Sequence, residues 1–171
     1  YIGEFAGLLN ISNTIFDENY IYASSSNGGG IRRATSDSNL IDYNNWDEIF
    51  SGSFKGMISN NGQILFYNDQ NIYTLNDGQI NNVLSLNNEI LHVSADDSKI
   101  IVTSKNQCLI YDNQFNELLF NINSNDFLTS FNNAIIDEND IYIGTTTNGV
   151  LRIENFDLSL NSYLLPNGPL E

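Results

Sequence analysis

The chain has 171 residues, 41% of them hydrophobic, which is enough for a sizeable core in a single domain of ordinary size. Its net charge is −15, from 21 acidic residues against 6 Lys and Arg, so binding to nucleic acid or to an anionic membrane surface is not expected. No apolar run approaches the roughly 20 residues of a membrane helix, so the protein is not expected to span a membrane. A neutral or cationic protein, or a glycan, suits this surface better.

The sequence repeats one pattern four times. The run "IYASS" at Ile21 returns as "ILFYN" at Ile64, "IIVTS" at Ile100 and "IYIGT" at Ile141, at spacings of 36 to 43 residues. A short apolar strand and a polar turn precede each run, a third strand follows it, and a more variable fourth strand closes the unit. First strands are expected near residues 14–16, 55–59, 90–94 and 133–137, and fourth strands near 44–49, 79–86, 116–122 and 161–165.

Four strands per repeat of this length are typical of the blades of a β-propeller. The runs at Ile100 and Ile141 are continuously apolar, as in middle strands that are covered on both faces. A β-sandwich is the alternative, but it gives no reason for four repeats in step. We therefore predict an all-β propeller of four four-stranded antiparallel blades, at about 10–50, 51–86, 87–122 and 123–165.

Residues 1–10 resemble the outer strand of a preceding unit, so residues 1–171 are expected to form a partial propeller, part of a larger ring of about seven blades. A closed four-bladed ring is the alternative. In an open arc the two terminal blades each leave an apolar face uncovered, and self-association through these faces is expected.

No residue pattern indicates catalysis, a cofactor or a metal. His92 is the single histidine and lies within a predicted first strand, where we expect a structural or channel-lining role. Cys108 is the single cysteine and is expected in the core. The acidic turns at 96–97 and 137–140 lack the ligand spacing and the central glycine of a calcium loop, so they are interpreted as hairpin turns.

Three further side chains have both a structural and a functional interpretation. Trp46 is expected to be a packing anchor, with a sugar-stacking platform as the alternative. Arg32 and Arg152 follow equivalent runs of two repeats, and this recurrence favours a structural role for both over ligand binding.

If the propeller binds a ligand, the loops between second and third strands are the place to look, because loops on a rigid scaffold can vary freely. These loops define no specific ligand. The candidate ligand-face residues in them are Ser25, Asn27, Asp69, Lys105, Thr146 and Asn148.

Two stretches, 21–49 and 141–170, carry a family resemblance. The second, with Gly144-Thr145, Asn148-Gly149 and Arg152, is similar to the repeat of two-component-regulator propellers. The two stretches contain the segments "GIRRA", "NLIDYNNW" and "PNGP". With these segments they resemble the amino-terminal propeller region of PorZ-type proteins of the type IX secretion system. The resemblance implies an exported protein at the cell surface or in the periplasm of a Gram-negative bacterium. It also implies partners among secretion proteins, a glycan or lipopolysaccharide.

Three classes of function therefore stand side by side. The first is a non-enzymatic module like the PorZ component, which assists the attachment of cargo to anionic lipopolysaccharide. The second is a periplasmic, ligand-sensing propeller of a hybrid two-component regulator that recognises an oligosaccharide. The third, a propeller hydrolase or lyase, is disfavoured because the sequence lacks a catalytic constellation.

Overall fold

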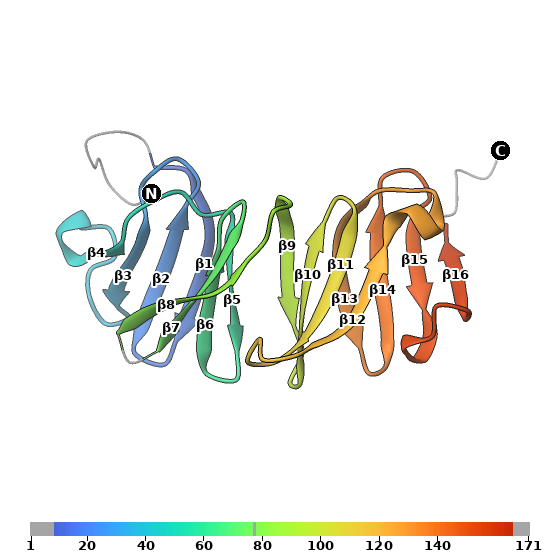
Figure 1. Ribbon diagram of the computed structural model, residues 1–171. Coiled ribbons are helices and arrows are strands. Elements are labelled where there is room, and N and C mark those ends of the chain that lie inside the picture. The colour runs from blue at the N-terminus through green and yellow to red at the C-terminus, as the bar shows by residue number, and fades with distance from the viewer. Residues whose placement is uncertain (1–8, 77, 166–171) are drawn as a thin grey trace. The chain divides into compact units, whose positions relative to one another are not determined.

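The computed structural model describes residues 9–76 and 78–165, and these residues form four antiparallel sheets of four strands each (Figure 1). In every sheet the strands are adjacent in chain order. The chain divides into two compact units, unit 1 up to Ser85 and unit 2 from Leu86. The expected all-β chain of four blade-like sheets is therefore confirmed, and each unit holds two of them, which we call blades 1 and 2 and blades 3 and 4.

Unit 1 contains eight strands and one short 3-10 helix, η1. The two sheets have the orders β1-β2-β3-β4 and β5-β6-β7-β8. Their elements are β1 (Ile11–Asp17), β2 (Tyr20–Ser25), β3 (Ile31–Thr35), η1 (Tyr43–Asn45), β4 (Asp47–Phe50), β5 (Gly56–Asn60), β6 (Gln63–Tyr67), β7 (Asn71–Asn76) and β8 (Gln79–Ser85).

Unit 2 repeats this plan with two further 3-10 helices, η2 and η3. Its sheets are β9 to β12 and β13 to β16, again with neighbours in chain order. Their elements are β9 (Ile90–Ala95), β10 (Lys99–Ser104), β11 (Gln107–Asp112), β12 (Leu118–Asn123), η2 (Ser124–Phe127), β13 (Phe131–Asp137), β14 (Asp140–Thr145), β15 (Val150–Ile153), η3 (Glu154–Phe156) and β16 (Asn161–Leu164).

The first strands lie where the sequence predicts them, and the turns show why. Asn61 and Gly62 both have positive φ, 49° and 75°, the conformation that a two-residue hairpin turn requires and that Asn and Gly adopt at low cost. Glu18 and Glu138 hold equivalent turn positions in blades 1 and 4, and both also have positive φ. The short polar turns therefore set the register of the hairpins they close.

The fourth strand of blade 1 begins later than predicted. Residues 43–45 form η1 instead of a strand, because the Asp42 carboxylate accepts a hydrogen bond from Asn44 N at 3.0 Å and caps a helical turn. The helices of the described residues have three or four residues each, and none of them could cross a membrane. The strand expected within residues 1–10 and the "PNGP" segment at 166–169 fall largely or wholly outside the described residues.

Blades 1 and 2 pack through one apolar cluster. Tyr22 and Ile31 of blade 1 contact Phe54, Met57 and Phe66 of blade 2, all with at most 5% of their surface exposed. The rings of Phe54 and Phe66 meet edge to face, with centroids 5.2 Å apart.

Hydrogen bonds fix how β1 and β5 meet. Ser12 Oγ donates to the Phe54 carbonyl at 2.8 Å, and Asn13 Nδ2 donates to the Met57 carbonyl at 3.0 Å. The junction of blades 1 and 2 is therefore held by side chains of the first strand of one blade and by the backbone of the next.

The junction of blades 3 and 4 has the same construction. Ser94 Oγ donates to the Ala134 carbonyl at 2.7 Å, and Ala134 has the register position in β13 that Met57 has in β5. The core beneath it is almost wholly excluded from solvent. Its buried members are Ile101, Cys108, Ile110, Ile122, Phe131, Ala134, Ile141, Ile143, Leu151 and Ile153.

Candidate recognition loops

The candidate ligand-face residues of unit 1 lie at one end of its two sheets. Ser25 and Asn27 belong to the β2–β3 turn, and Asp69 belongs to the β6–β7 turn. The segment that enters β5 links the two turns, because Phe54 N donates to the Ser25 carbonyl at 2.8 Å and Lys55 Nζ pairs with Asp69 Oδ1 at 2.8 Å. The structure therefore brings these three predicted residues into one loop cluster.

The candidate residues of unit 2 are linked in the same way. Lys105 lies in the β10–β11 turn, and its carbonyl accepts a hydrogen bond from Phe131 N at 3.0 Å. Thr146 and Asn148 lie in the β14–β15 turn, and Thr146 N donates to the Ser130 carbonyl at 2.9 Å. Phe54 and Phe131 thus serve the same purpose in two blades, since each ties the start of a first strand to the loop of the preceding blade.

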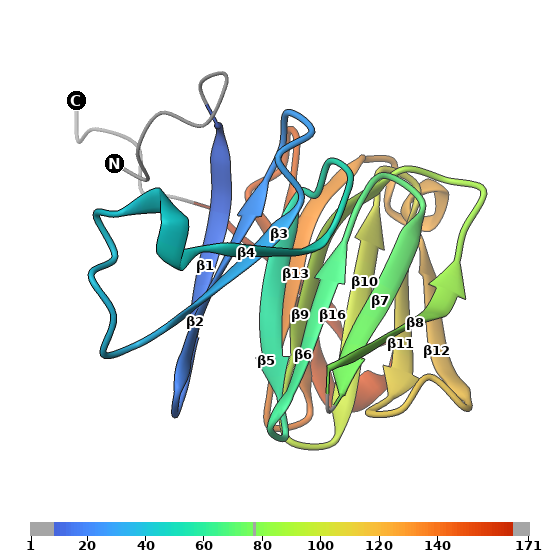
Figure 2. The ribbon, with the colours of Figure 1, turned by 90° about the vertical axis from the view of Figure 1, so that its left-hand side faces the viewer.

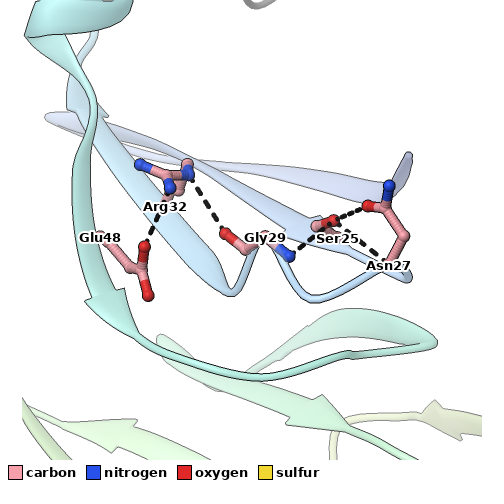
Figure 3. Close-up of polar contacts among 5 residues, drawn as sticks. All are labelled: Ser25, Asn27, Gly29, Arg32 and Glu48. Carbon is pink, nitrogen blue, oxygen red and sulfur yellow. Dashed lines mark hydrogen bonds and ion pairs between the residues drawn. The ribbon is translucent and has the colours of Figure 1, made fainter. Parts of the chain in front are cut away.

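The β2–β3 turn is held rigid by its own side chains (Figure 3). Ser25 Oγ accepts from Gly29 N at 3.2 Å and donates to Asn27 Oδ1 at 2.7 Å. Asn27 Oδ1 also accepts from Asn10 N at 2.9 Å, which attaches the turn to the residue before β1. The tip of this turn, 26–28, is exposed, so a braced base presents polar atoms to solvent.

Arg32 supports the same turn from the neighbouring strand (Figure 3). Its Nε donates to the Gly29 carbonyl at 3.1 Å, and its Nη2 pairs with Glu48 Oε2 at 2.9 Å. The Arg32 side chain thereby joins the end of the turn to β4. This contact set is compatible with the structural role expected for Arg32.

The β14–β15 turn has a comparable brace. Thr145 Oγ1 donates to the Gly149 carbonyl at 2.9 Å and accepts from Asn148 N at 3.0 Å. Ser25 and Thr145 thus occupy the same place in the two turns, and each uses a hydroxyl to close the loop base. In both turns, the residue that closes the loop base is a serine or threonine at the end of the second strand.

The pairing register corrects the expected equivalence of Arg32 and Arg152. Arg152 lies opposite Tyr142, whereas Tyr22, the counterpart of Tyr142, lies opposite Arg33. The β2–β3 turn is one residue longer, with Ser25 N bonded to the Gly30 carbonyl where Thr145 N bonds to the Gly149 carbonyl. The additional glycine shifts the third strand by one residue, and with it the face that each arginine occupies.

Arg33 and Arg152 then share a setting. The Arg33 guanidinium lies 4.7 Å from the centre of the Tyr20 ring, and that of Arg152 lies 6.0 Å from the centre of the Tyr142 ring. Arg152 also bonds to Asp140 Oδ2 through Nε at 3.0 Å and through Nη2 at 2.6 Å. These bonds lower the pKa of Asp140 and raise that of Arg152.

A hollow of about 670 Å³ lies at the other end of unit 1, away from the β2–β3 and β6–β7 turns. Sequence reasoning missed it, because its wall combines the β1–β2, β5–β6 and β7–β8 turns, which no motif connects. Burial raises the pKa of Tyr22 on this wall. The residues around the hollow are Asp17, Glu18, Asn19, Tyr20, Tyr22, Arg33, Gly62, Ile64, Leu75, Asn76 and Gly78.

Trp46 and Cys108 are both buried. The Trp46 indole is 7% exposed, packs on Ala23 and Ala34, and donates from Nε1 to the Leu40 carbonyl at 3.1 Å. A ring in this position is a packing anchor and offers no face for a sugar. Burial raises the pKa of the Cys108 thiol to about 12, so the reactive thiolate is suppressed at neutral pH.

His92 lies in β9 at the register position that Asn13 has in β1 and Asn133 has in β13. It is half-buried and bonds to the backbone of Ala134, the carbonyl that Ser94 also uses. Burial lowers the pKa of His92. His92 therefore lies at the junction of blades 3 and 4. Among the described residues, no three His, Cys, Asp or Glu side chains are grouped so that they could hold a metal ion.

This placement predicts an acid-sensitive contribution to stability. A histidine whose pKa is lower in the folded state binds more protons when unfolded, so its contribution is lost as pH falls below about 6.5. We expect His92→Asn, which installs the side chain that blades 1 and 4 have at this position, to remove this loss. Urea denaturation between pH 7.5 and 5.5 measures it, and parallel pH profiles for the two proteins would contradict the expectation.

This chain is similar in fold to several proteins of known structure. No protein-family model and no curated protein sequence matches this chain. Among solved structures, the computationally designed Ika4 protein aligns with a TM-score of 0.62 and 10% identity, over 90% of this chain and 97% of that one. Identity at this level shows the fold alone.

Two of the similar structures are bacterial. PorZ of Porphyromonas gingivalis, described as an essential bacterial surface component of the type IX secretion system, aligns with a TM-score of 0.64 and 13% identity over 99% of this chain. The extracellular domain of BT4673 from B. thetaiotaomicron, described as a one-component system, aligns with a TM-score of 0.63 and 20% identity over 82% of this chain. The chain spans 22% of the PorZ chain and 19% of the BT4673 chain.

These comparisons define the class: a chain of blade-like four-stranded sheets with propeller-like neighbours. The resemblance to PorZ-type proteins is confirmed at the level of fold.

Proposed function

We propose that this chain is a non-enzymatic recognition module of an exported bacterial protein, of the kind that PorZ-type proteins use at the cell surface. The observation that carries the proposal is the construction of the loops between second and third strands. Each has a base tied by a backbone hydrogen bond to the start of a first strand or to the segment just before it, and a polar tip. Such a loop loses little conformational freedom on binding, which favours affinity.

The chemistry of the tips fits a hydroxyl-rich or peptide partner. Ser26, Asn27, Thr146 and Asn148 provide hydroxyl and amide groups, which can both donate and accept hydrogen bonds. The lysines beside these loops, Lys55 and Lys105, are among the six basic residues of a strongly acidic chain. These two lysines give the loop ends positive charge on a chain that is acidic as a whole. The proposed partners are secretion-system proteins or the sugar portion of lipopolysaccharide.

A ligand-sensing propeller that recognises an oligosaccharide is the second candidate. It is favoured by the similarity to the BT4673 extracellular domain and by the same loops. The two candidates share a binding face and differ in the domains that accompany the module.

Titration of the ¹⁵N-labelled chain with lipopolysaccharide core oligosaccharide tests the binding face. We expect shifts at Asn27 and Asn148 and a loss of affinity of about tenfold in Asn148→Ala, as for one or two lost hydrogen bonds. Asn139→Ala, in the exposed β13–β14 turn at the other end of blade 4, is the matched control and should bind normally. Shifts confined to that other end would contradict the proposal, as would turnover of a chromogenic glycoside that Asp69→Asn abolishes.

A further inference from the structure

One face of blade 4 keeps the side chains of a blade junction while it stays open to solvent. In β14 Ile141 and Ile143 point into the junction with blade 3, so the alternating Tyr142 points to the other face. Ile135 lies opposite Tyr142, and Leu164 lies opposite Val150 on this same face. Ile135 is 53% exposed and Leu164 is 47% exposed. We call Ile135, Tyr142, Val150 and Leu164 the open face.

The same four register positions are covered in blades 1 and 3. Tyr22 and Ile31 of blade 1 correspond to Tyr142 and Val150, and both are buried against blade 2. In blade 3 these two positions are Ile101 and Cys108, and the position of Leu164 is Ile122. These three side chains are wholly buried against blade 4. In both junctions, the covering element is the next sheet, entered through its first strand.

The open face also carries the polar group of a junction. Asn133 has the register position of Asn13, and each lies just after an irregularity in the pairing of the first strand. Asn13 Nδ2 donates to a carbonyl of blade 2, whereas the Asn133 side chain is exposed and makes no hydrogen bond to another described residue. The face therefore presents an apolar patch together with an exposed amide group at the register position of a junction donor.

The complementary half of such a junction lies on β1. Phe131 and Ala134 of β13 are buried against blade 3, and their register counterparts in β1 are Ile11 and Thr14. Both β1 residues are exposed, and Phe16, two residues after Thr14, is 65% exposed.

The rest of this face of blade 1 is occupied. The segment before β4 lies on the side of blade 1 away from blade 2, and Trp46 covers Ala23 and Ala34 there (Figure 2). The cover reaches β2 and β3 and leaves the Ile11, Thr14 and Phe16 side chains of β1 exposed. In each of the two observed junctions, a first strand packs against the preceding blade. Because its side chains are exposed, β1 can form a third junction of this kind.

We propose that a second copy of this chain covers the open face, with β1 of one copy docked on blade 4 of the other. The contact repeats the two junctions already present within the chain, and Asn133 Nδ2 then donates to the Thr14 carbonyl, the counterpart of the Met57 and Ala134 carbonyls. Because different surfaces of the two copies meet, the contact is head to tail. It closes into a ring of copies or continues as a chain, according to the angle between them.

Two single variants test the two halves of this contact in the complete chain. Ile135→Asp places a charge on the open face, and Phe16→Asp places one on β1. Leu128→Asp, at a 91% exposed residue in the β12–β13 connection, is the control for an added charge on an exposed apolar side chain. Ile135→Ser and Phe16→Ala are milder versions, since β9 carries Ser94 and Ala95 at these two register positions.

Light scattering over a concentration series, with circular dichroism to confirm folding, gives the readout. We expect the wild type and Leu128→Asp to associate, and Ile135→Asp and Phe16→Asp each to weaken association at least tenfold. Mixing these two variants should restore a dimer, because one intact junction then remains between them.

Other results would overturn the proposal. A wild type that stays monomeric at high concentration would mean that the open face is covered within one chain or needs a different partner. Normal association of Phe16→Asp, with loss in Ile135→Asp alone, would mean that two open faces pair with each other. Failure of the mixed variants to associate, where the milder pair also fails, would exclude a head-to-tail contact.

Discussion

We expect replacement of Phe131 by Ala to lower the free energy of unfolding by about 3–5 kcal/mol, the usual cost of truncating a buried phenylalanine. The ring is wholly buried in the core between blades 3 and 4. The hydrogen bond from Phe131 N to the Lys105 carbonyl survives the substitution, so the loss measures packing alone. Urea denaturation followed by far-ultraviolet circular dichroism gives the value.

Leu128→Ala is the neighbouring control. Leu128 lies shortly before Phe131 in the chain and is 91% exposed. Because its side chain is exposed, its truncation should change the free energy of unfolding by less than about 0.5 kcal/mol. A small effect at Phe131, or equal effects at the two positions, would contradict the packing described for the junction of blades 3 and 4.

Replacement of Gly30 by Ala is expected to cost about 2–4 kcal/mol, from two sources. Gly30 has a φ of +74°, which disfavours any residue with a Cβ. The added Cβ would also overlap the backbone carbonyl oxygen of Phe50, so β4 would have to move. Since Trp46 lies just before β4, the fluorescence of this single tryptophan reports the unfolding of the region.

Gly28→Ala separates the two sources. Gly28 has a φ of +90°, but no atom lies within 4 Å of an added Cβ, so only the conformational cost of about 1–2 kcal/mol remains. A loss at Gly30 no larger than that at Gly28 would show that β4 accommodates the methyl group without cost.

The strands could be predicted because the repeat imposes the same local pattern four times. Residues 100–102 of β10 are all apolar because both faces of this strand are covered, and such a run can be recognised in the sequence alone. The start of β4 could not be predicted in this way. Only the repeat placed Asn44 and Asn45 in a strand, and the cap from Asp42 makes them part of a helical turn instead.

The arginines show a second limit of sequence reasoning. Spacing along the chain aligns Arg32 with Arg152, but one additional residue in the β2–β3 turn exchanges the faces of Arg32 and Arg33. The side-chain period of a strand is two, so a one-residue error in register inverts the prediction for every residue after it. Loop lengths in a hairpin must therefore be known before equivalent residues can be assigned.

The location of the candidate loop residues within each unit could be predicted, because loops between second and third strands lie at one end of their sheets. Their bracing was not, since it depends on which hydroxyl reaches which backbone atom, as at Ser25 and Thr145. The hollow beside Tyr20 could not be predicted from the sequence either. It exists only where turns of two sheets meet.

The bond from Phe54 N to the Ser25 carbonyl, and its counterpart from Phe131 N to the Lys105 carbonyl, has a consequence for how such a module can evolve. The acceptor in each case is a backbone atom, so the side chain at that position can change without loss of the bond. The accepting carbonyl belongs to a six-residue loop base in blade 1 and to a short turn in blade 3. New binding specificities can thus accumulate at the loop tips by ordinary point substitution, while the spacing between neighbouring sheets is inherited unchanged.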